Sequence, residues 1–453
     1  MEKVKLYEIV EAVNGSFGYV SDIDVCSIST DTRTLVPDSV FVALSGPNFD
    51  GHDYAVKAMQ MGAVAVITDR AVDGAKCIIV DSTQKALLQL GAFYRRKFRG
   101  LKLVGVTGSV GKTSTKDMIA LVLSKRYSTL KTQKNFNNEI GLPMTLFNLS
   151  SENEVAVIEM GMSNLGEISR LSQVAQPTLA VITNIGYSHI ENLGTQESIL
   201  KAKLEILDGA DSDAPIIMCM DDKLLSSAEI RGERRKIYYS VSKKQADVFA
   251  SDINKDNNGI SFDINYNGEK INARVNVHGT HNVKNALAAF CVGLEYGVEP
   301  SDMVEAIAEF KTEGVRQNIV VDNSVTYFLD CYNASPDAMN SAFETLKDYD
   351  NSGRKIAVLA DMLELGKKSK MLHRMVGEAF AATQADMLVC YGVEAEQIIE
   401  GAVKKGYPAE NTKHFLDRDE MTEFLKSEIH EGDMVLFKGS HGMKLDEIYN
   451  RLK

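Results

Sequence analysis

A glycine-rich segment near residue 110 has the residue types of a phosphate-binding loop. It reads Thr107-Gly-Ser-Val-Gly-Lys-Thr-Ser114, between an apolar run and a helical pattern. Glycines let backbone N–H groups turn toward phosphate oxygens, and the following helix N-terminus adds partial positive charge. Lys112 is placed to reach the β- and γ-phosphates, and the Thr113 hydroxyl to bind Mg²⁺. Val106 stands where the general pattern has its first glycine, so a glycine-rich turn with a chance lysine is the alternative to ATP binding. The predicted nucleotide contacts are Gly108, Ser109, Val110, Gly111, Lys112, Thr113 and Ser114.

Two candidate magnesium ligands follow predicted strands beyond this loop. Glu159 ends the apolar run 155–160, and His189 comes shortly after the run 179–184. Ligands of open α/β sheets bind beyond the carboxyl ends of the strands, and a carboxylate beside bound phosphates suits Mg²⁺. Each side chain also has a plainer interpretation. Glu159 could be a solvent-facing carboxylate, and His189 a structural histidine.

Two lysines and two groups of amides have roles that their spacing leaves open. Lys201 and Lys203 lie on one predicted helix, where both are expected to be exposed. Asn282 and Asn285 share a helix face because they are three residues apart. They could equally read a base edge or cap the helix. The loop 131–145 could bind a polar substrate or simply turn the chain, through Asn135, Asn137 and Asn138.

Alternating strands and helices must position these residues. Apolar runs predict strands, and amphipathic segments predict helices between them. This alternation is typical of a doubly wound, largely parallel α/β sheet. The stretch 247–277 differs, because alternating patterns and two Asn-Gly turns predict antiparallel hairpins. The predicted strands are 39–44, 62–68, 76–80, 101–107, 155–160, 179–184, 216–220, 319–321, 326–331, 355–360, 387–391 and 434–437, and the predicted helices include 54–61, 82–96, 113–126, 282–296 and 301–310.

The pattern divides the chain into three predicted domains, 1–98, 99–312 and 313–453. The first boundary lies at the basic stretch 95–100, which we interpret as a solvated helix end, since cations suit a helix C-terminus. The last boundary lies where a second, smaller α/β rhythm begins, with a helix entered by Ser335-Pro336.

The charge and hydrophobicity of the sequence exclude some classes of binding partner for this protein. The 453 residues carry 62 acidic and 50 basic side chains, a net charge of −12, which disfavours a general nucleic-acid binder. No apolar stretch approaches the length of a membrane helix. We therefore expect a cytoplasmic protein that contacts neither nucleic acid nor membranes. The spacing of the six cysteines excludes a CxxC metal or redox site, and we expect buried, reduced thiols.

Taken together, these motifs resemble those of the Mur ligases, ATP-dependent enzymes of peptidoglycan precursor synthesis. The resemblance covers nearly the whole chain and rests on the phosphate loop, on His189 and Lys203, and on the segments 137–143, 159–161 and 281–285. Within the family, three segments are similar to members that add D-alanyl-D-alanine to UDP-N-acetylmuramoyl-tripeptide: 330–336, 359–366 and 437–443. The resemblance implies a UDP-substrate-binding N-terminal domain, a central ATP-binding parallel-sheet domain and a C-terminal Rossmann-like ligase domain.

The resemblance also implies roles for individual residues. Lys203 matches the lysine that the family carbamylates, and a carbamate supplies the anionic oxygen that a second Mg²⁺ needs. ATP and two Mg²⁺ ions are the implied cofactors. The implied catalytic set is Lys112, Glu159, His189 and Lys203, the implied metal ligands are Thr113, Glu159, His189 and Lys203, and the implied nucleotide contacts outside the loop are Asn282, Asn285, Arg316 and Asp330.

The implied substrate contacts fall into three groups. The UDP group comprises Ser29, Asp31, Arg33, Asn48, Asp50 and His52, the central group Asn137 and Asn138, and the dipeptide group Tyr332, Asn333, Ser335 and His441. The chain departs from the family at three positions, where Ser335 replaces asparagine, Ala360 replaces glycine and His441 replaces arginine. A histidine cannot reproduce the bidentate grip of arginine on a carboxylate.

The implied reaction forms an acyl phosphate from the tripeptide carboxylate and ATP, which the amine of D-alanyl-D-alanine then attacks. We expect a monomer. Two alternatives remain open at this point. A sister Mur ligase, or a polyglutamate-type or cyanophycin-type ligase, would use a different amino acid. A catalytically silent scaffold would bind ATP without substrate-dependent phosphate release.

Overall fold

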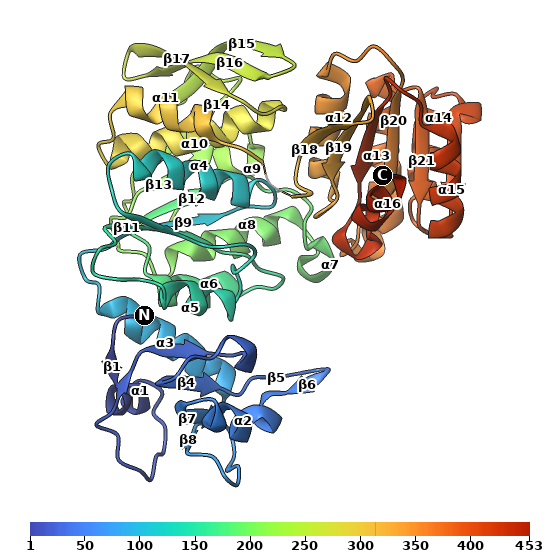
Figure 1. The fold of residues 1–453 in the computed structure, drawn as a ribbon. Helices are drawn as coiled ribbons and strands as arrows, with labels where there is room; N and C mark the ends of the chain where they lie inside the picture. Colours follow the sequence, from blue (N-terminus) through green and yellow to red (C-terminus); the bar gives the residue numbers. More distant parts are fainter. Residues whose placement is uncertain (313) are drawn as a thin grey trace.

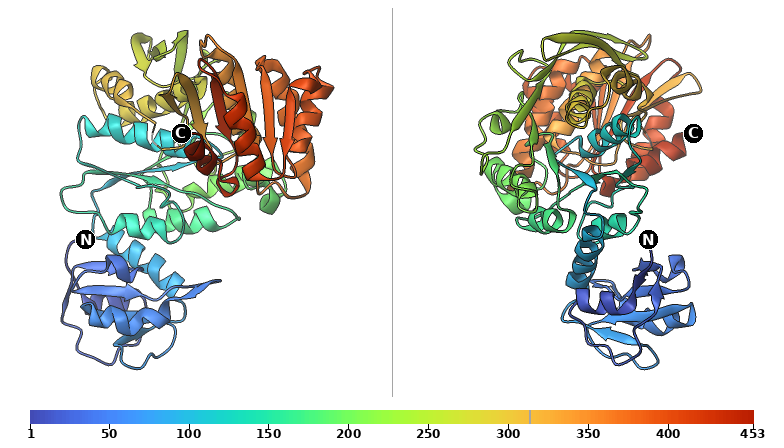
Figure 2. Two further views of the ribbon diagram at one scale, coloured as in Figure 1. Left: turned by 45° about the vertical axis from the view of Figure 1, so that its right-hand side comes forward. Right: turned by 90° about the vertical axis from the view of Figure 1, so that its left-hand side faces the viewer.

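A computed structural model of the protein describes residues 1–312 and 314–453 and contains three main sheets, of four, nine and six strands. The predicted boundary at residue 313 lies outside the described residues. We use N-terminal part for residues 1–96, central part for 102–309 and C-terminal part for 314–453. The N-terminal part lies below the central part, and the C-terminal part lies beside it (Figures 1 and 2).

The N-terminal part is a parallel four-stranded sheet, ordered β3-β4-β7-β8, with two small antiparallel pairs. Helix α3 connects the N-terminal part to the central part. Its apolar face packs against helices α5 and α6 of the central part. The strands are β1 (Val4–Lys5), β2 (Asp24–Val25), β3 (Ser27–Ser29), β4 (Ser39–Val42), β5 (Ser45–Gly46), β6 (Phe49–Asp50), β7 (Ala63–Thr68) and β8 (Cys77–Ile79), and the helices α1 (Leu6–Ala12), α2 (Ala55–Gln60) and α3 (Thr83–Arg96).

The basic stretch 95–100, which begins in the last turn of α3, is not simply the solvated helix end that the sequence suggested. Arg95 is buried, and its Nε donates to Ala175 O at 2.9 Å. Its guanidinium also donates to Phe98 O and Leu101 O. Arg95 therefore satisfies carbonyl groups where the N-terminal part meets the central part.

The central part is one sheet of nine strands, ordered β10-β11-β9-β12-β13-β14-β15-β16-β17. The strands from β10 to β15 run parallel, and β15, β16 and β17 form the predicted antiparallel hairpins. The strands are β9 (Lys102–Thr107), β10 (Thr129–Lys131), β11 (Val155–Glu159), β12 (Leu179–Ile182), β13 (Ile216–Cys219), β14 (Lys236–Ser240), β15 (Val248–Asp256), β16 (Gly259–Tyr266) and β17 (Glu269–Val275).

Helices cover both faces of this sheet (Figure 1). They are α4 (Lys112–Ser124), α5 (Gly141–Leu146), α6 (Glu167–Ala175), α7 (Ile190–Leu193), α8 (Gln196–Leu204), α9 (Lys223–Ser226), α10 (Thr280–Glu295) and α11 (Pro300–Glu309). Val106 pairs in register with both Glu159 and Val181, so β9, β11 and β12 end at one edge. The loops after these three strands therefore emerge side by side.

The C-terminal part is a six-stranded sheet, ordered β18-β19-β23-β20-β21-β22, parallel except for β18. Its strands are β18 (Asn318–Asp322), β19 (Val325–Asp330), β20 (Lys355–Ala360), β21 (Met387–Tyr391), β22 (Thr412–Phe415), which was not predicted, and β23 (Met434–Lys438). Its helices are α12 (Pro336–Asp348), α13 (Ser369–Phe380), α14 (Glu396–Lys404), α15 (Arg418–Glu428) and α16 (Leu445–Leu452). Short 3₁₀ turns lie at Thr32–Thr34, Gly51–Tyr54, Glu205–Leu207, Gly366–Lys368, Ala381–Thr383, Ala409–Asn411 and His441–Met443.

The cysteines are all free thiols, as predicted, but only four of them are buried. Cys26 and Cys77 are half-buried in the N-terminal part, so the prediction of burial is wrong for these two. Within the described residues, every helix is too short or too polar to cross a membrane.

Candidate functional site

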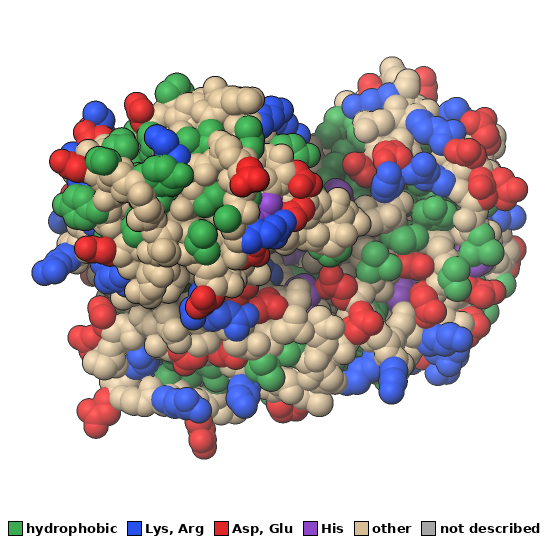
Figure 3. Space-filling view, turned by 90° about the horizontal axis from the view of Figure 1, so that it is seen from below, with side chains coloured by type: hydrophobic (Ala, Val, Ile, Leu, Met, Phe, Trp, Pro, Cys, Tyr) green, Lys and Arg blue, Asp and Glu red, His purple; other side chains and the backbone are tan. Residues whose placement is uncertain are grey.

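A cavity of about 670 Å³ lies between the central and C-terminal parts. Seen from below the view of Figure 1, the surface is hollowed between two masses, and histidine and acidic side chains gather there (Figure 3). The cavity brings together most of the predicted nucleotide, metal and dipeptide residues, namely Ser109, Val110, Gly111, Lys112, Thr113, Ser114, Asn137, Asn138, Glu159, His189, Asn285, Arg316, Asp330, Tyr332 and Asn333. The predicted residues outside its lining are Gly108, Lys203, Asn282, Ser335, His441 and the UDP group.

The phosphate loop connects β9 to α4, as predicted. Gly111 precedes the helix with a φ of 80°, a left-handed conformation that suits glycine. Lys112 Nζ donates to Gly108 O at 2.8 Å and to Ser109 O at 3.2 Å. Burial lowers the pKa of the Lys112 amine below its usual value. The lysine therefore lies along its own loop, at the position where it can neutralise an anion.

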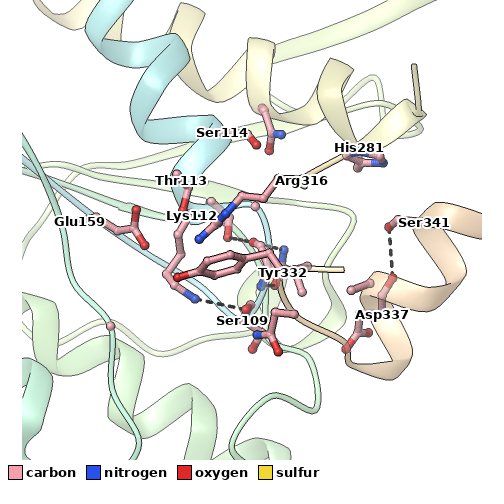
Figure 4. Close-up of a pocket in the computed structure, with 18 of the residues that line it drawn as sticks. Ser109, Lys112, Thr113, Ser114, Glu159, His281, Arg316, Tyr332, Asp337 and Ser341 are labelled. Atoms are coloured by element: carbon pink, nitrogen blue, oxygen red, sulfur yellow. Dashed lines mark hydrogen bonds between the residues drawn. The ribbon is translucent and has the colours of Figure 1, made fainter. Parts of the chain in front are cut away.

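Arg316 of the C-terminal part reaches across the cavity to the phosphate loop. Its Nη1 donates to Thr113 Oγ1 at 2.8 Å, and its guanidinium carbon lies 3.4 Å from the ring centroid of Tyr332. Figure 4 shows Arg316 and Tyr332 side by side, facing Lys112 and Thr113 at the start of α4. The stacked ring fixes the planar guanidinium beside the loop.

Glu159 does not face solvent, since its side chain is 2% exposed at the end of β11. Its Oε1 accepts a hydrogen bond from Asn137 Nδ2 at 2.8 Å. Its Oε2 is buried and has no hydrogen-bond partner among the residues that the structure describes. A buried, unpaired carboxylate oxygen is costly, and a cation would satisfy it.

The donor set around Glu159 fits Mg²⁺ held partly by nucleotide phosphates. Within the described residues, no group of three His, Cys, Asp or Glu side chains converges on one point. Such a group is not required, because Mg²⁺ commonly takes one or two carboxylates together with waters and phosphate oxygens. Glu159 Oε2 and the Thr113 hydroxyl supply ligands of this kind on the same cavity.

His189 faces the C-terminal part. Its Nδ1 lies 2.6 Å from Glu364 Oε2 without the geometry of a hydrogen bond, and the proximity of His189 lowers the pKa of Glu364. A carboxylate that holds one ring nitrogen leaves the other available, which is the usual arrangement of a metal-binding histidine.

Lys203 is buried, with 2% of its surface exposed, so the expectation that both helix lysines are exposed is wrong for it. Lys201, two residues earlier on α8, is exposed as expected. Burial, and secondarily the charge of Lys112, lowers the pKa of Lys203 well below its usual value. The amine is therefore biased toward its neutral form.

The two amides of α10 differ. Asn282 is fully buried and donates to His278 O at 2.7 Å, so it holds the start of the helix and lies outside the cavity lining. Asn285 reaches the cavity, but its Oδ1 accepts from Thr115 Oγ1 at 2.9 Å. Both side-chain amides are thus already hydrogen-bonded to other protein groups, and not only available to a nucleotide base.

The predicted dipeptide group is only partly assembled. Tyr332 and Asn333 line the cavity, whereas Ser335 is buried and its Oγ accepts the Ala338 N–H as the cap of α12. His441 is exposed, with its ring centroid 5.8 Å from that of Tyr332.

Two further polar side chains that line the cavity, one from each part, have local partners. Asp330 is paired with buried Lys438, whose Nζ lies 2.6 Å from its Oδ2. Asn138 Oδ1 accepts the Gly141 N–H at 2.8 Å and caps the turn before α5.

The predicted UDP group lies in the N-terminal part, away from the cavity. His52 is buried between two carboxylates, with Nδ1 2.6 Å from Asp50 Oδ1 and Nε2 3.0 Å from Asp69 Oδ1. Hydrogen bonds from Arg33 lower the pKa of Asp31 to about 2. Asp50 and His52 thus hold the β5–β6 hairpin together, while Ser29 is buried in β3.

Sequence reasoning missed several residues that line the cavity, including Asp222, His281, Lys284, Asp337 and Lys438. Asp222 follows β13 and Lys438 ends β23, so position after a strand end was an available signal for both. His281 and Lys284 lie within the quoted segment 281–285 beside Asn282, where only the amides were singled out.

Comparison with known proteins gives consistent matches along the chain. Three family models match: the Mur ligase family catalytic domain over residues 24–94, the Mur ligase middle domain over 106–293 and the Mur ligase glutamate ligase domain over 315–441. The chain is 37% identical to a UDP-N-acetylmuramoyl-tripeptide--D-alanyl-D-alanine ligase of Bacillus subtilis, covering 100% of this chain and 99% of that protein. The corresponding ligase of Escherichia coli is 32% identical with the same coverage.

Solved structures agree with these matches. A MurF crystal structure from Acinetobacter baumannii has a TM-score of 0.92 at 29% identity, covering 100% of this chain and 99% of that one. A MurF ligase from Thermotoga maritima in complex with ADP has a TM-score of 0.82 at 28% identity, covering 94% and 96%.

Proposed function

The chain belongs to the Mur ligase family, and we propose that it uses ATP to join D-alanyl-D-alanine to UDP-N-acetylmuramoyl-tripeptide. The product would be the UDP-linked pentapeptide, an intermediate of peptidoglycan synthesis. The relatives that match nearly end to end are named for this reaction. The observation that carries the proposal is the cavity, which places a phosphate loop on one wall and the C-terminal part on the other.

The proposed reaction has two steps. A carboxylate oxygen of the tripeptide attacks the γ-phosphorus of ATP, the bond to the β–γ bridging oxygen breaks, and ADP leaves. The amine of D-alanyl-D-alanine then attacks the acyl carbon, loses a proton, and the carbon–oxygen bond to phosphate breaks. Catalysis of the first step is mostly positioning and charge stabilisation.

The residues of the cavity suit that requirement. The backbone of the phosphate loop and Lys112 would bind the β- and γ-phosphates, with Arg316 on the opposite side. Glu159, Thr113 and His189 would hold Mg²⁺, which would neutralise phosphate charge. Asn137 would keep Glu159 oriented through its bond to Oε1.

Lys203 would be carbamylated in the active enzyme and would serve a second Mg²⁺. Its burial and lowered pKa support this, because CO₂ adds to a neutral amine. Lys201 has neither property.

The three substrates would be shared among three domains, 1–98, 99–312 and 313–453. The N-terminal domain would bind the UDP moiety near the β5–β6 hairpin, the central domain ATP, and the C-terminal domain the dipeptide. We propose a monomer that works in the cytoplasm, where ATP and nucleotide-linked precursors occur together.

Phosphate release by purified protein tests the proposal, with ATP, Mg²⁺, UDP-N-acetylmuramoyl-tripeptide and D-alanyl-D-alanine each omitted in turn. Release that requires all four, with a UDP-pentapeptide product, is expected. Release that needs a free amino acid instead of the dipeptide would identify a sister ligase. ATP binding without release under any condition would contradict the proposal and favour a scaffold.

A further inference from the structure

We propose that Asp337 is a positioning residue, through which the C-terminal part sets the loop that follows β12. The effect on catalysis rests on the proposed function, whereas the contact itself does not. Asp337 is the second residue of α12, and it lines the cavity opposite the phosphate loop (Figure 4).

Three successive backbone amides of the segment 185–187 are each held by a side-chain oxygen. The first donates to Asp222 Oδ2 at 2.7 Å, the second to Ser109 Oγ at 2.8 Å and the third to Asp337 Oδ2 at 3.0 Å. These acceptors come from the loop after β13, from the phosphate loop and from α12. Of the three, only Asp337 belongs to the C-terminal part, so it alone links the segment to the position of that part.

Gly186 makes this contact close. A Cβ on Gly186 would collide with the carboxylate of Asp337, and its next neighbour would be Ser109 Cβ at 3.3 Å. The φ of Gly186 is not in the left-handed region, so an alanine would cause no backbone strain but would have to displace the Asp337 carboxylate. The carboxylate and the glycine are therefore matched in size across the two parts.

The segment leads directly to His189. Residues of the C-terminal part also contact the chain from His189 to Gly194. Glu364 Oε2 lies 2.6 Å from His189 Nδ1, Glu364 O accepts the Glu191 N–H at 3.2 Å, and Lys368 Nζ donates to Gly194 O at 2.7 Å. Asp337 makes the first of these contacts, at residue 187. Loss of the Asp337 carboxylate would therefore shift the segment 185–187 away from Ser109 and would change the position of His189, which follows it.

A four-variant set tests the inference: Asp337→Ala, Asp337→Asn, Gly186→Ala, and the double variant Gly186→Ala/Asp337→Ala. We expect Asp337→Ala to lower kcat about tenfold or more, with KM for ATP within about twofold, because misplacement affects the reacting geometry more than binding. Asp337→Asn should recover most of kcat, since its Oδ1 can accept the same N–H. Gly186→Ala should be as impaired as Asp337→Ala, and the double variant should be no worse than either single variant.

Glu344→Gln, an exposed change on the same helix, is the matched control and should keep wild-type kinetics. Failure of Asp337→Asn to recover activity would overturn the inference, because a direct anionic contact with substrate would then explain the loss. Additive losses in the double variant would also overturn it.

Amide hydrogen exchange separates this inference from the proposed reaction. In Asp337→Ala, the amide of Tyr187 should exchange at least about tenfold faster, while that of Ile185, held by Asp222, should not change. Unchanged exchange at Tyr187 would refute the contact. If the wild-type protein releases no phosphate with any amine, the reaction proposal fails while the exchange result still stands.

Discussion

Glu364 Oε2 lies 2.6 Å from Nδ1 of His189, so a residue of the C-terminal part holds an imidazole of the central part. Both residues have left-handed backbone conformations, with φ of 62° and 63°, which few residues other than glycine adopt. Two uncommon conformations meet at one contact beside the cavity. This pair makes the orientation of His189 depend on where the C-terminal part sits.

Glu364→Ala should weaken the response to magnesium. Without the carboxylate, the His189 ring loses the partner that fixes its orientation, and such losses typically reduce metal affinity about 10- to 100-fold. The measurement is phosphate release as a function of Mg²⁺ concentration. Lys367→Ala, an exposed change three residues further along the chain, should leave the curve in place. An unshifted curve for Glu364→Ala would mean that its contact with His189 does not support a metal ligand.

Arg316→Ala should raise KM for ATP about tenfold, since charged hydrogen bonds of this kind contribute about 1.5–3 kcal/mol. Arg316 is the cation that the C-terminal part presents to Thr113. Tyr332→Phe is the matched control, because it keeps the stacked ring and should keep KM for ATP. Equal effects of the two substitutions would mean that the tyrosine hydroxyl, not the guanidinium, governs binding.

Lys203→Arg should abolish most activity, by two orders of magnitude or more on the scale of lost electrostatic stabilisation. Arginine has a side chain of similar length but cannot form a carbamate. Lys201→Arg on the same helix should retain nearly full activity, since that side chain is exposed. The rates of phosphate release by the two variants, measured with and without added bicarbonate, check the prediction. Full activity of Lys203→Arg would exclude the carbamate.

His373 should make stability fall on the acidic side of neutrality. Its ring is fully buried, its Nε2 accepts the Met362 N–H at 2.9 Å, and burial lowers its pKa below the usual 6.5. His373 is therefore protonated near pH 6.5 in the unfolded chain, but only at lower pH in the folded protein. The free energy of unfolding thus decreases as pH falls below about 6.5.

Melting temperatures between about pH 7.5 and pH 5.5 test this prediction. Over that range, the melting temperature of the wild-type protein should fall by more than that of His373→Gln. Because desolvation also lowers the pKa of half-buried His281, the difference between wild type and variant is the informative quantity. Identical slopes would mean that His373 contributes nothing to the acid sensitivity.

Sequence patterns were sufficient for most of the fold. The apolar runs that became β9, β11 and β12 are continuous because these strands are buried on both faces. The unpredicted strand β22 is short and only half-buried, so its pattern is weak. Elements β1 to β3 were missed because each spans only two or three residues.

Site residues could be predicted only where the function depends on residues close together in the sequence. The phosphate loop is one such case. Lys203 could have been separated from Lys201, since it follows Ile199 by four residues and precedes Ile206 by three, and both are buried. Asp337 could not have been found in this way, because its partners lie about 150 residues away and meet it only through docking of two parts.

The cavity shared between two parts has a consequence for cooperativity. Anything that binds both walls at once, as ATP is proposed to do, acts as a cross-link between the central and C-terminal sheets. Linkage is reciprocal, so docking raises nucleotide affinity by the same factor by which nucleotide favours docking. A contact that favours docking, such as the Lys368–Gly194 hydrogen bond, therefore increases the population of the form that binds nucleotide more tightly. Residues that never touch ATP would thus contribute to its dissociation constant.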